Sequence, residues 1–216
     1  MSRVLVINPN SSRSITDAID LALSPLREQT RTTLDVLGLS GGPAGIQTQQ
    51  DVESVVAPIL TGLRSEIADA YVIACFSDPG LHAARELSKV PVFGIAESGI
   101  LAALARGTRF GILSILSTSI PRHLRYIGAM GVQARFAGDR AIGVGVTDLA
   151  DAQHTLYRLY QVGVTLRDTD HADVLIMGCA GMARYRDELA RQLGIPVVEP
   201  TLAAAADALG AVACGW

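Results

Sequence analysis

The sequence predicts an α/β fold of two pseudo-symmetric lobes, each a parallel sheet flanked by helices. First, short runs of Val, Ile and Leu alternate with segments of helical apolar spacing, a pattern typical of parallel βαβ units. Second, hydrophobic residues make up 49% of the 216 residues, yet no apolar run approaches the ~20 residues of a membrane span. A high hydrophobic content without a membrane span favours sheets that are buried on both faces. Third, the second half of the chain repeats motifs of the first.

The first half of the chain contains four expected strands and the helices between them. The strands are short continuous apolar runs, at 4–7, 34–37, 71–75 and 92–95. Helices are expected where apolar residues recur every three or four positions, after the turn 8–12 and over 51–67, 81–87 and 99–105. The segment 40–50 is polar and rich in glycine, and it predicts a loop.

The second half of the chain alternates in the same way. Strands are expected at 110–113, 132–136, 141–146, 174–177 and 197–198. Helices are expected over 121–130, 149–167, 183–193 and 202–212. Strands that alternate with helices along the whole chain predict parallel sheets rather than an antiparallel sandwich.

An internal repeat divides the chain into these two lobes. The matched pairs, in order and at nearly constant offset, are 3–7 with 109–113, 68–75 with 172–179, and 90–92 with 195–197. Each copy of the central segment ends in a cysteine, Cys75 or Cys179. Any two βαβ sequences share some likeness, but a cysteine in the same position of both copies favours a true duplication.

Composition and charge exclude several classes of partner. The formal net charge is −3, from 18 basic and 21 acidic residues, so the chain lacks the positive surface that nucleic acid or an anionic membrane would require. We therefore expect a small-molecule substrate as the partner, with no nucleic acid and no membrane. Three cysteines do not make a disulfide framework, and the first residues form a strand rather than a signal peptide, which points to the cytoplasm.

The sequence offers no cofactor or metal site. Pyridoxal phosphate needs a lysine, and the single lysine, Lys89, lies in a polar turn before a strand. The four histidines lack the spacing of metal ligands, and we expect them to be solvated or to cap helices: they are His82, His123, His154 and His171.

Two cysteines stand where ligands bind in such folds. Cys75 and Cys179 each follow a buried strand, and open parallel sheets bind ligands beyond the carboxyl ends of their strands. After Cys75, Ser77 or Asp78 can cap the next helix, with Pro79 at its first position. The positive end of that helix would lower the pKa of a thiol toward neutrality.

Two facing thiols can invert a carbon centre. A thiolate removes a proton from one face of a carbon acid, and a thiol on the other face returns one, with no cofactor if a carbonyl adjoins the carbon. A lone cysteine at a strand end is more often inert core, but two at equivalent strand ends favour a function. We therefore expect the active site in the cleft between the lobes. Cys214 has no counterpart in the repeat and is interpreted as structural.

Four motifs together resemble the aspartate/glutamate/hydantoin racemase superfamily, and its hydantoin and allantoin racemase branch most. They are 7–12, 75–81 followed by 84–86, 94–97, and 178–182. The resemblance implies a cofactor-independent racemase and a homo-oligomer, with Cys75 and Cys179 as the acid/base pair. It implies substrate contacts from Asn8, Asn10, Ile46, Phe76, Ser77, Ser114, Leu116, Ala180 and Gly181. It also implies a discontinuous first lobe, residues 1–96 plus 205–216, with 97–204 as the second lobe.

Two departures from the branch bear on the substrate. Ser77 stands where the branch usually has Gly, and Gly45 and Gln47 stand where its loop usually has Ser and Glu. The leading hypothesis is racemisation of a 5-substituted hydantoin or an allantoin-like ring. The alternatives are an aspartate or glutamate racemase, a maleate isomerase-like or arylmalonate decarboxylase-like enzyme, and a two-lobed binding protein without catalysis.

Overall fold

Two four-stranded parallel sheets form the frame of the molecule, whose computed structural model describes residues 2–216. The first sheet, in the order β2-β1-β3-β4, consists of β1 (Arg3–Asn8), β2 (Thr33–Gly38), β3 (Ala70–Ile73) and β4 (Val92–Gly94). The second, in the order β6-β5-β7-β8, consists of β5 (Phe110–Ser114), β6 (Phe136–Ala141), β7 (Val174–Met177) and β8 (Val197–Val198). All pairings are parallel and the two orders are equivalent, which confirms the predicted pseudo-symmetric α/β fold.

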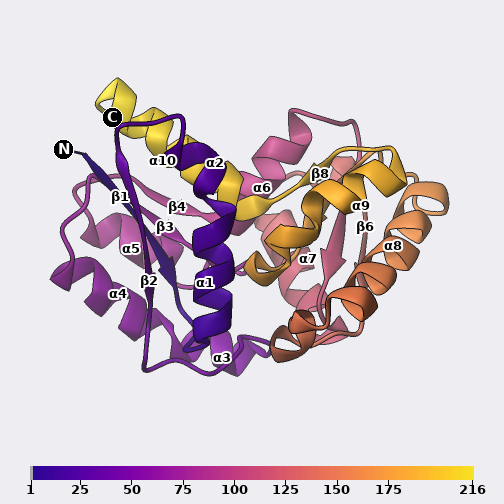
Figure 1. Ribbon diagram of the computed structural model, residues 1–216, viewed down its shortest axis with the longest axis horizontal. Helices are drawn as coiled ribbons and strands as arrows, with labels where there is room; N and C mark the ends of the chain where they lie inside the picture. The colour runs from indigo at the N-terminus through magenta and orange to yellow at the C-terminus, as the bar shows by residue number, and fades with distance from the viewer. Residues whose placement is uncertain (1) are drawn as a thin grey trace.

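Helices cover both sheets, one sheet in each half of the view in Figure 1. The helices of the first half are α1 (Arg13–Ala22), α2 (Ser24–Arg27), α3 (Gln49–Ser54), α4 (Val56–Ser65), α5 (Leu81–Leu87) and α6 (Ile95–Leu104). Those of the second half are α7 (Ile120–Met130), α8 (Ala152–Asp168), α9 (Arg186–Leu193) and α10 (Pro200–Cys214). Short 3-10 segments are found at Ser117–Ser119, Gln133–Arg135, Val146–Ala150 and Ala180–Tyr185. None of the helices in residues 2–216 is long and apolar enough to cross a membrane.

The last helix connects the two halves of the fold. α10 packs against α6 and contacts β1, β3 and β4 of the first sheet, whereas α6 also contacts β5, β7 and β8 of the second. Figure 1 shows α10 returning toward the side of the molecule where the chain begins. The lobe boundaries 1–96 plus 205–216 and 97–204 stay a prediction that this packing supports.

The first sheet is buried on both faces because its strands alternate between two cores. Leu5 and Ile7 of β1 pack with Ile59 of α4 and Leu81 of α5 in one apolar cluster. Their neighbours along the strand, Val4 and Val6, belong to the larger core that extends into the second lobe. Period-two alternation places apolar side chains on both faces, so the strands appear in the sequence as continuous apolar runs.

The repeat is visible in an equivalent pair of hydrogen bonds in each lobe, one to an aspartate side chain and one between backbone groups. Arg3 and Asp69 form a reciprocal pair: Arg3 N donates to Asp69 Oδ2 (2.7 Å), and Asp69 N donates to Arg3 O (2.7 Å). Arg109 and Asp173, their counterparts in the second lobe, form the same pair at 2.8 and 3.0 Å. These bonds hold together the starts of the two inner strands in each sheet, β1 with β3 and β5 with β7.

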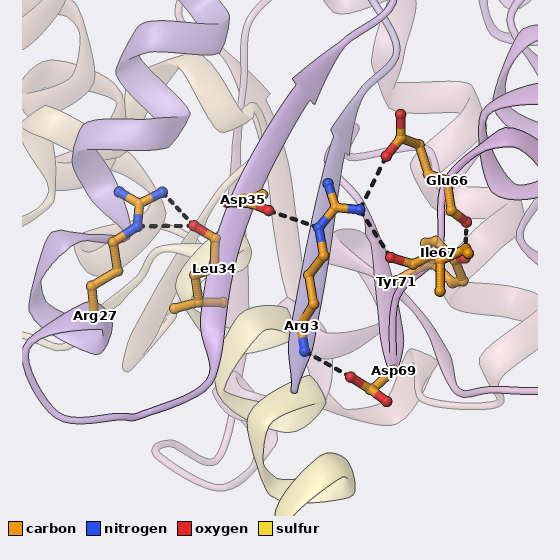
Figure 2. Close-up of polar contacts among 8 residues, drawn as sticks. All are labelled: Arg3, Arg27, Leu34, Asp35, Glu66, Ile67, Asp69 and Tyr71. Atoms are coloured by element: carbon orange, nitrogen blue, oxygen red, sulfur yellow. Dashed lines mark hydrogen bonds and ion pairs between the residues drawn. The ribbon is translucent and has the colours of Figure 1, made fainter. Parts of the chain in front are cut away.

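Figure 2 shows how arginine side chains brace the first sheet. Arg3 Nε donates to Asp35 of β2 (2.7 Å), and its Nη1 donates to Glu66 (3.0 Å) and to the Ile67 carbonyl (2.9 Å). Arg27 donates to the carbonyl of Leu34 at 3.0 and 2.8 Å. The Asp35 and Glu66 carboxylates raise the pKa of Arg3, but these partly exposed ion pairs contribute little to stability.

The structure corrects the expected strands at 132–136 and 141–146. The strand is Phe136–Ala141, which lies between them, and Gln133–Arg135 form a 3-10 turn. Because β6 is a half-buried edge strand that carries Asp139 and Arg140, it lacks a continuous apolar run. Beyond it Ile142 N still donates to Ser114 O (2.8 Å), but Gly143 has a φ of +75° and ends the ladder. The helix expected over 51–67 is broken at Val55 into α3 and α4.

Candidate active site

A small cavity brings together the two strand-end cysteines. Its volume is about 30 Å³, and both Cys75 and Cys179 line it. The equivalent strand ends place them there, because Ala74 N donates to Ile7 O (2.8 Å) and Gly178 N to Leu113 O (2.9 Å) in the respective lobes. The other lining residues are Asn10, Ile15, Ile46, Ala74, Phe76, Ser77, Ile115, Ser119, Arg122, His123, Val146, Gly178, Ala180 and Gly181.

Both cysteines are half-buried residues, and the loss of solvation around their sulfur atoms keeps both thiols protonated. Burial raises the pKa of Cys75 to about 12, and the charges of Cys179 and Asp78 add to it, while the Ser77 N–H and Arg122 oppose the shift. Burial likewise raises the pKa of Cys179 to about 11, against the hydrogen bond from Gly181 N–H. The expected lowering is therefore wrong. The helix after Cys75 begins only at Leu81, six residues further along the chain, and desolvation is the largest influence on the pKa of the thiol.

Asp78 caps a different helix from the one that the sequence suggested. Its carboxylate accepts hydrogen bonds from Ala96 N and Glu97 N, both at 2.9 Å, at the start of α6, and from the Tyr126 hydroxyl of α7 at 2.7 Å. The cap of α5 is Gly80, with a φ of +70° and no side-chain hydrogen bond. Burial outweighs the three donors and raises the pKa of Asp78 to about 6. The turn that begins at Cys75 is thus tied to elements of both halves.

The asparagines of the first turn have different roles. Asn10 lines the cavity, whereas Asn8 lies behind it and donates from Nδ2 to Asn10 Oδ1 (3.1 Å) and to Thr16 Oγ1 (3.0 Å). Asn10 Oδ1 also accepts from Ser12 N (2.9 Å). Because its oxygen already accepts two hydrogen bonds, the amide N–H groups of Asn10 are the part of the side chain left to donate.

Besides Asn8, two of the predicted contacts lie outside the cavity lining. Ser114 is fully buried and donates to Asp139 Oδ1 at 2.5 Å. Leu116 is half-buried, and its neighbour Ile115 lines the cavity instead. The predicted residues that the structure places on the cavity are Asn10, Ile46, Cys75, Phe76, Ser77, Cys179, Ala180 and Gly181.

Arg122 is a cavity residue that the sequence reasoning missed. The residue is 8% exposed, and its guanidinium donates to the carbonyls of Thr118 (3.0 Å) and Gln47 (3.4 Å) and to the hydroxyls of Ser119 (3.2 Å) and Ser77 (3.4 Å). It therefore joins α7 to the loop before α3 and to the Cys75 turn. Burial lowers the pKa of Arg122 and the Cys75 charge opposes this.

His123 is also part of the cavity wall, which corrects the expectation of a solvated histidine. It is 4% exposed, its Nδ1 donates to Asp139 Oδ2 (2.7 Å), and its ring meets Phe76 edge to face at 5.2 Å. The other three histidines are exposed, as expected. A helical projection of 120–130 places Arg122 and His123 on the same face as Ser119 and Tyr126. This shared face was the signal in the sequence that could have indicated both residues.

Gly45 and Gln47, the two loop residues that differ from the usual sequence of the branch, also lie against the cavity wall. A Cβ at Gly45 would lie 2.8 Å from Cβ of Val146, a cavity residue, so the loop approaches the second lobe closely only with glycine there. Gln47 contributes its backbone oxygen to Arg122 (3.4 Å) and to Thr118 Oγ1 (3.1 Å). Within residues 2–216, no group of three or more His, Cys, Asp or Glu side chains is placed to hold a metal ion.

The amino-acid sequence matches a known protein family over nearly the whole chain. A family model described as Asp/Glu/hydantoin racemase matches residues 4–208. The chain belongs to this racemase family. Its likeness to individual members then locates the branch of the family.

Two curated relatives and a solved structure carry that likeness. The racemase is 34% identical to the hydantoin racemase of a Pseudomonas species over 208 residues, which cover 93% of this chain and 82% of that one. It is 34% identical to the hydantoin racemase of Paenarthrobacter aurescens, with 99% and 92% covered. The allantoin racemase from Klebsiella pneumoniae superposes with a TM-score of 0.90 at 31% identity, covering 100% of this chain and 89% of that one. The racemase is thus an isomerase of the hydantoin and allantoin branch, and the resemblance stated from the motifs is confirmed.

Proposed function

We propose that the racemase inverts the carbonyl-adjacent stereocentre of a 5-substituted hydantoin or allantoin-like ring by proton transfer between two thiols. The observation that carries the proposal is that Cys75 and Cys179, which follow β3 of the first sheet and β7 of the second, line the same cavity. The substrate class is supported by the names of the relatives, which are hydantoin and allantoin racemases.

The chemistry divides between the two cysteines. The thiolate of one removes the proton from the stereocentre, and its S–H bond forms as the C–H bond breaks. The electron pair moves onto the adjacent carbonyl oxygen, and the facing thiol then returns a proton to the opposite face of the carbon. With the other enantiomer the two cysteines exchange roles. The Asn10 amide and the Arg122 guanidinium line the same cavity and are placed to stabilise the negative charge on the substrate.

The cavity must open for the substrate to enter. Its 30 Å³ hold about one water molecule, whereas a ring with two carbonyls needs several times more. We therefore propose that the Cys75 and Cys179 turns move apart and then close on the bound ring. Opening also exposes the half-buried cysteines further to water and lowers the cost of forming the thiolate, and closure removes that water from around the facing thiol, which is the proton donor.

The setting we propose for this enzyme is a homo-oligomer in the cytoplasm. All of its cysteines are free, which suits a reducing compartment. Leu101 (50% exposed) and Trp216 (82% exposed) line a surface groove beside α6 and α10, an apolar surface of the kind that a second copy covers. Sedimentation velocity of the full chain at several concentrations would separate an oligomer from a monomer.

Racemisation is expected to become faster as the pH rises through neutrality. The base must be a thiolate, and burial raises the pKa of Cys75 to about 12 and of Cys179 to about 11. Below the pKa the thiolate fraction grows about tenfold per pH unit, so log kcat/KM should rise with a slope near one between about pH 6 and about pH 8. A pH series with a blank for spontaneous racemisation checks this, and a flat or falling profile would contradict it.

The substrate class is tested with single enantiomers followed by polarimetry. We expect the purified enzyme to remove the optical rotation of 5-substituted hydantoins or allantoin, and to leave aspartate and glutamate unchanged. Maleate and arylmalonates in parallel samples report isomerisation and CO₂ release, the alternative chemistries of this fold. Turnover of either one, or racemisation of the amino acids only, would overturn the proposed substrate.

A further inference from the structure

A second, larger cavity adjoins the thiol cavity. Its volume is about 250 Å³, and four residues line both cavities: Phe76, Ser77, Arg122 and His123. Phe76 directly follows Cys75, and its ring packs edge to face on His123. The His123 ring is in turn held by Asp139 (2.7 Å). The wall between the two cavities therefore consists of this ring pair, in which Asp139 anchors His123, and of Ser77 and Arg122, whose Nε donates to the Ser77 hydroxyl (3.4 Å).

The lining of the second cavity is mostly apolar. Its remaining apolar residues come from α3, α6, β5 and α7, and are Val52, Ala96, Ile100, Ile112, Tyr126, Ile127 and Ala129. Gln49 and Arg125, both exposed, also line it, and Arg125 Nη2 donates to Gln49 Oε1 at 2.8 Å. The cavity is thus an apolar chamber with a polar contact between α3 and α7 at its rim.

We infer that this chamber receives the substituent on the stereocentre, and that it selects an apolar substituent of about the size of a benzyl group. The inference rests on the proposed function, because it takes the ring to lie between Cys75 and Cys179. A cavity of about 150 Å³ with an aliphatic and aromatic lining is enough for benzene, so 250 Å³ has room for an aromatic ring and its methylene. The Phe76–His123 pair lies where the substituent leaves the ring.

The same lining disfavours a polar substituent. A ureido group, as in allantoin, would carry several N–H and C=O groups past Ser77 and Arg122 into the part of the chamber that is lined by Val, Ile and Ala side chains, where few of them find partners. Each well-packed methylene in an apolar pocket changes kcat/KM by about 10-fold or more. We expect kcat/KM for 5-benzylhydantoin to exceed that for allantoin by at least about 10-fold.

The inference is tested by a larger side chain at the rim of the chamber, which reduces the space inside it. Ala129 is an exposed residue of α7 that lines the chamber, so Ala129→Phe adds a ring there without disturbing the buried core. We expect it to lower the ratio of kcat/KM for 5-benzylhydantoin to that for 5-methylhydantoin by at least about 10-fold. The matched control is Leu124→Phe on the same helix, because Leu124 is 48% exposed and lies outside the chamber lining. It should leave the ratio at the wild-type value.

The outcomes separate this inference from the proposed function. If the wild-type enzyme racemises neither hydantoin, the proposed function fails. If it racemises both and Ala129→Phe leaves their ratio unchanged, or Leu124→Phe shifts it equally, the chamber does not hold the substituent and the inference is overturned. A thermal melt of each variant shows that the protein tested is folded.

Discussion

Replacement of either cavity cysteine by serine is expected to abolish racemisation. A serine hydroxyl does not ionise in the working pH range, so the Cys75→Ser and Cys179→Ser variants each lack the base for one enantiomer and an effective acid for the other. General acid–base catalysis contributes about 10²- to 10⁴-fold, and we expect kcat to fall by at least that much in both directions. Polarimetry from each pure enantiomer measures it.

The third cysteine provides the control for this substitution. Cys214 is exposed at the end of α10 and does not line the thiol cavity. Cys214→Ser should therefore racemise at the wild-type rate. Normal activity in Cys75→Ser and in Cys179→Ser would show that the thiols are bystanders, and the proposed mechanism would be wrong.

The Gly178→Ala variant is expected to lose both stability and activity. A Cβ at this position would lie 2.7 Å from the carbonyl oxygen of Leu113 and 3.3 Å from Cγ2 of Ile112. The close contact is with backbone, which cannot rotate away, so β5 and β7 must separate where Gly178 N donates to that same oxygen (2.9 Å). Overpacking of this kind costs about 1–3 kcal/mol, and a displacement of about 1 Å at the adjacent Cys179 costs about 10²-fold in kcat.

The same substitution elsewhere isolates the steric cause. Gly210 lies inside α10, and a Cβ added there would meet no neighbouring side chain or strand within 4 Å. Gly210→Ala should therefore leave the activity unchanged and raise stability by about 0.5–1 kcal/mol. Urea unfolding gives the free energy of each variant. A Gly178→Ala protein as stable and as active as the wild type would contradict the packing described around Cys179.

The sequence was sufficient for the central strands and the position of both thiols. Buried parallel strands such as Val174–Met177 appear as apolar runs, and the repeat aligns Cys75 with Cys179. The edge strand Phe136–Ala141 could not be found in this way, because its apolar run is interrupted by Asp139, whose buried carboxylate binds His123, and by the partly exposed Arg140. Its pairing with β5 is set by tertiary contacts rather than by its own composition.

The rest of the site depends on partners that are distant in sequence. Arg122 contacts Gln47 and Ser77, and His123 contacts Asp139, so the helical spacing that groups the two residues does not by itself place them on the cavity. The direction of the thiol pKa shift also required the structure. A helix terminus near Cys75 suggested a lower pKa, but the depth of burial decides the sign.

Solvent deuterium exchange by the two serine variants tests the central claim most directly. Each variant keeps one thiol on one face of the stereocentre, so in D₂O each should exchange the hydrogen of a single enantiomer without inverting it. Cys75→Ser and Cys179→Ser should act on opposite enantiomers, as followed by NMR of each pure substrate. Exchange of the same enantiomer by both variants, or of both enantiomers by either one, would show that the thiols do not flank the carbon from opposite sides.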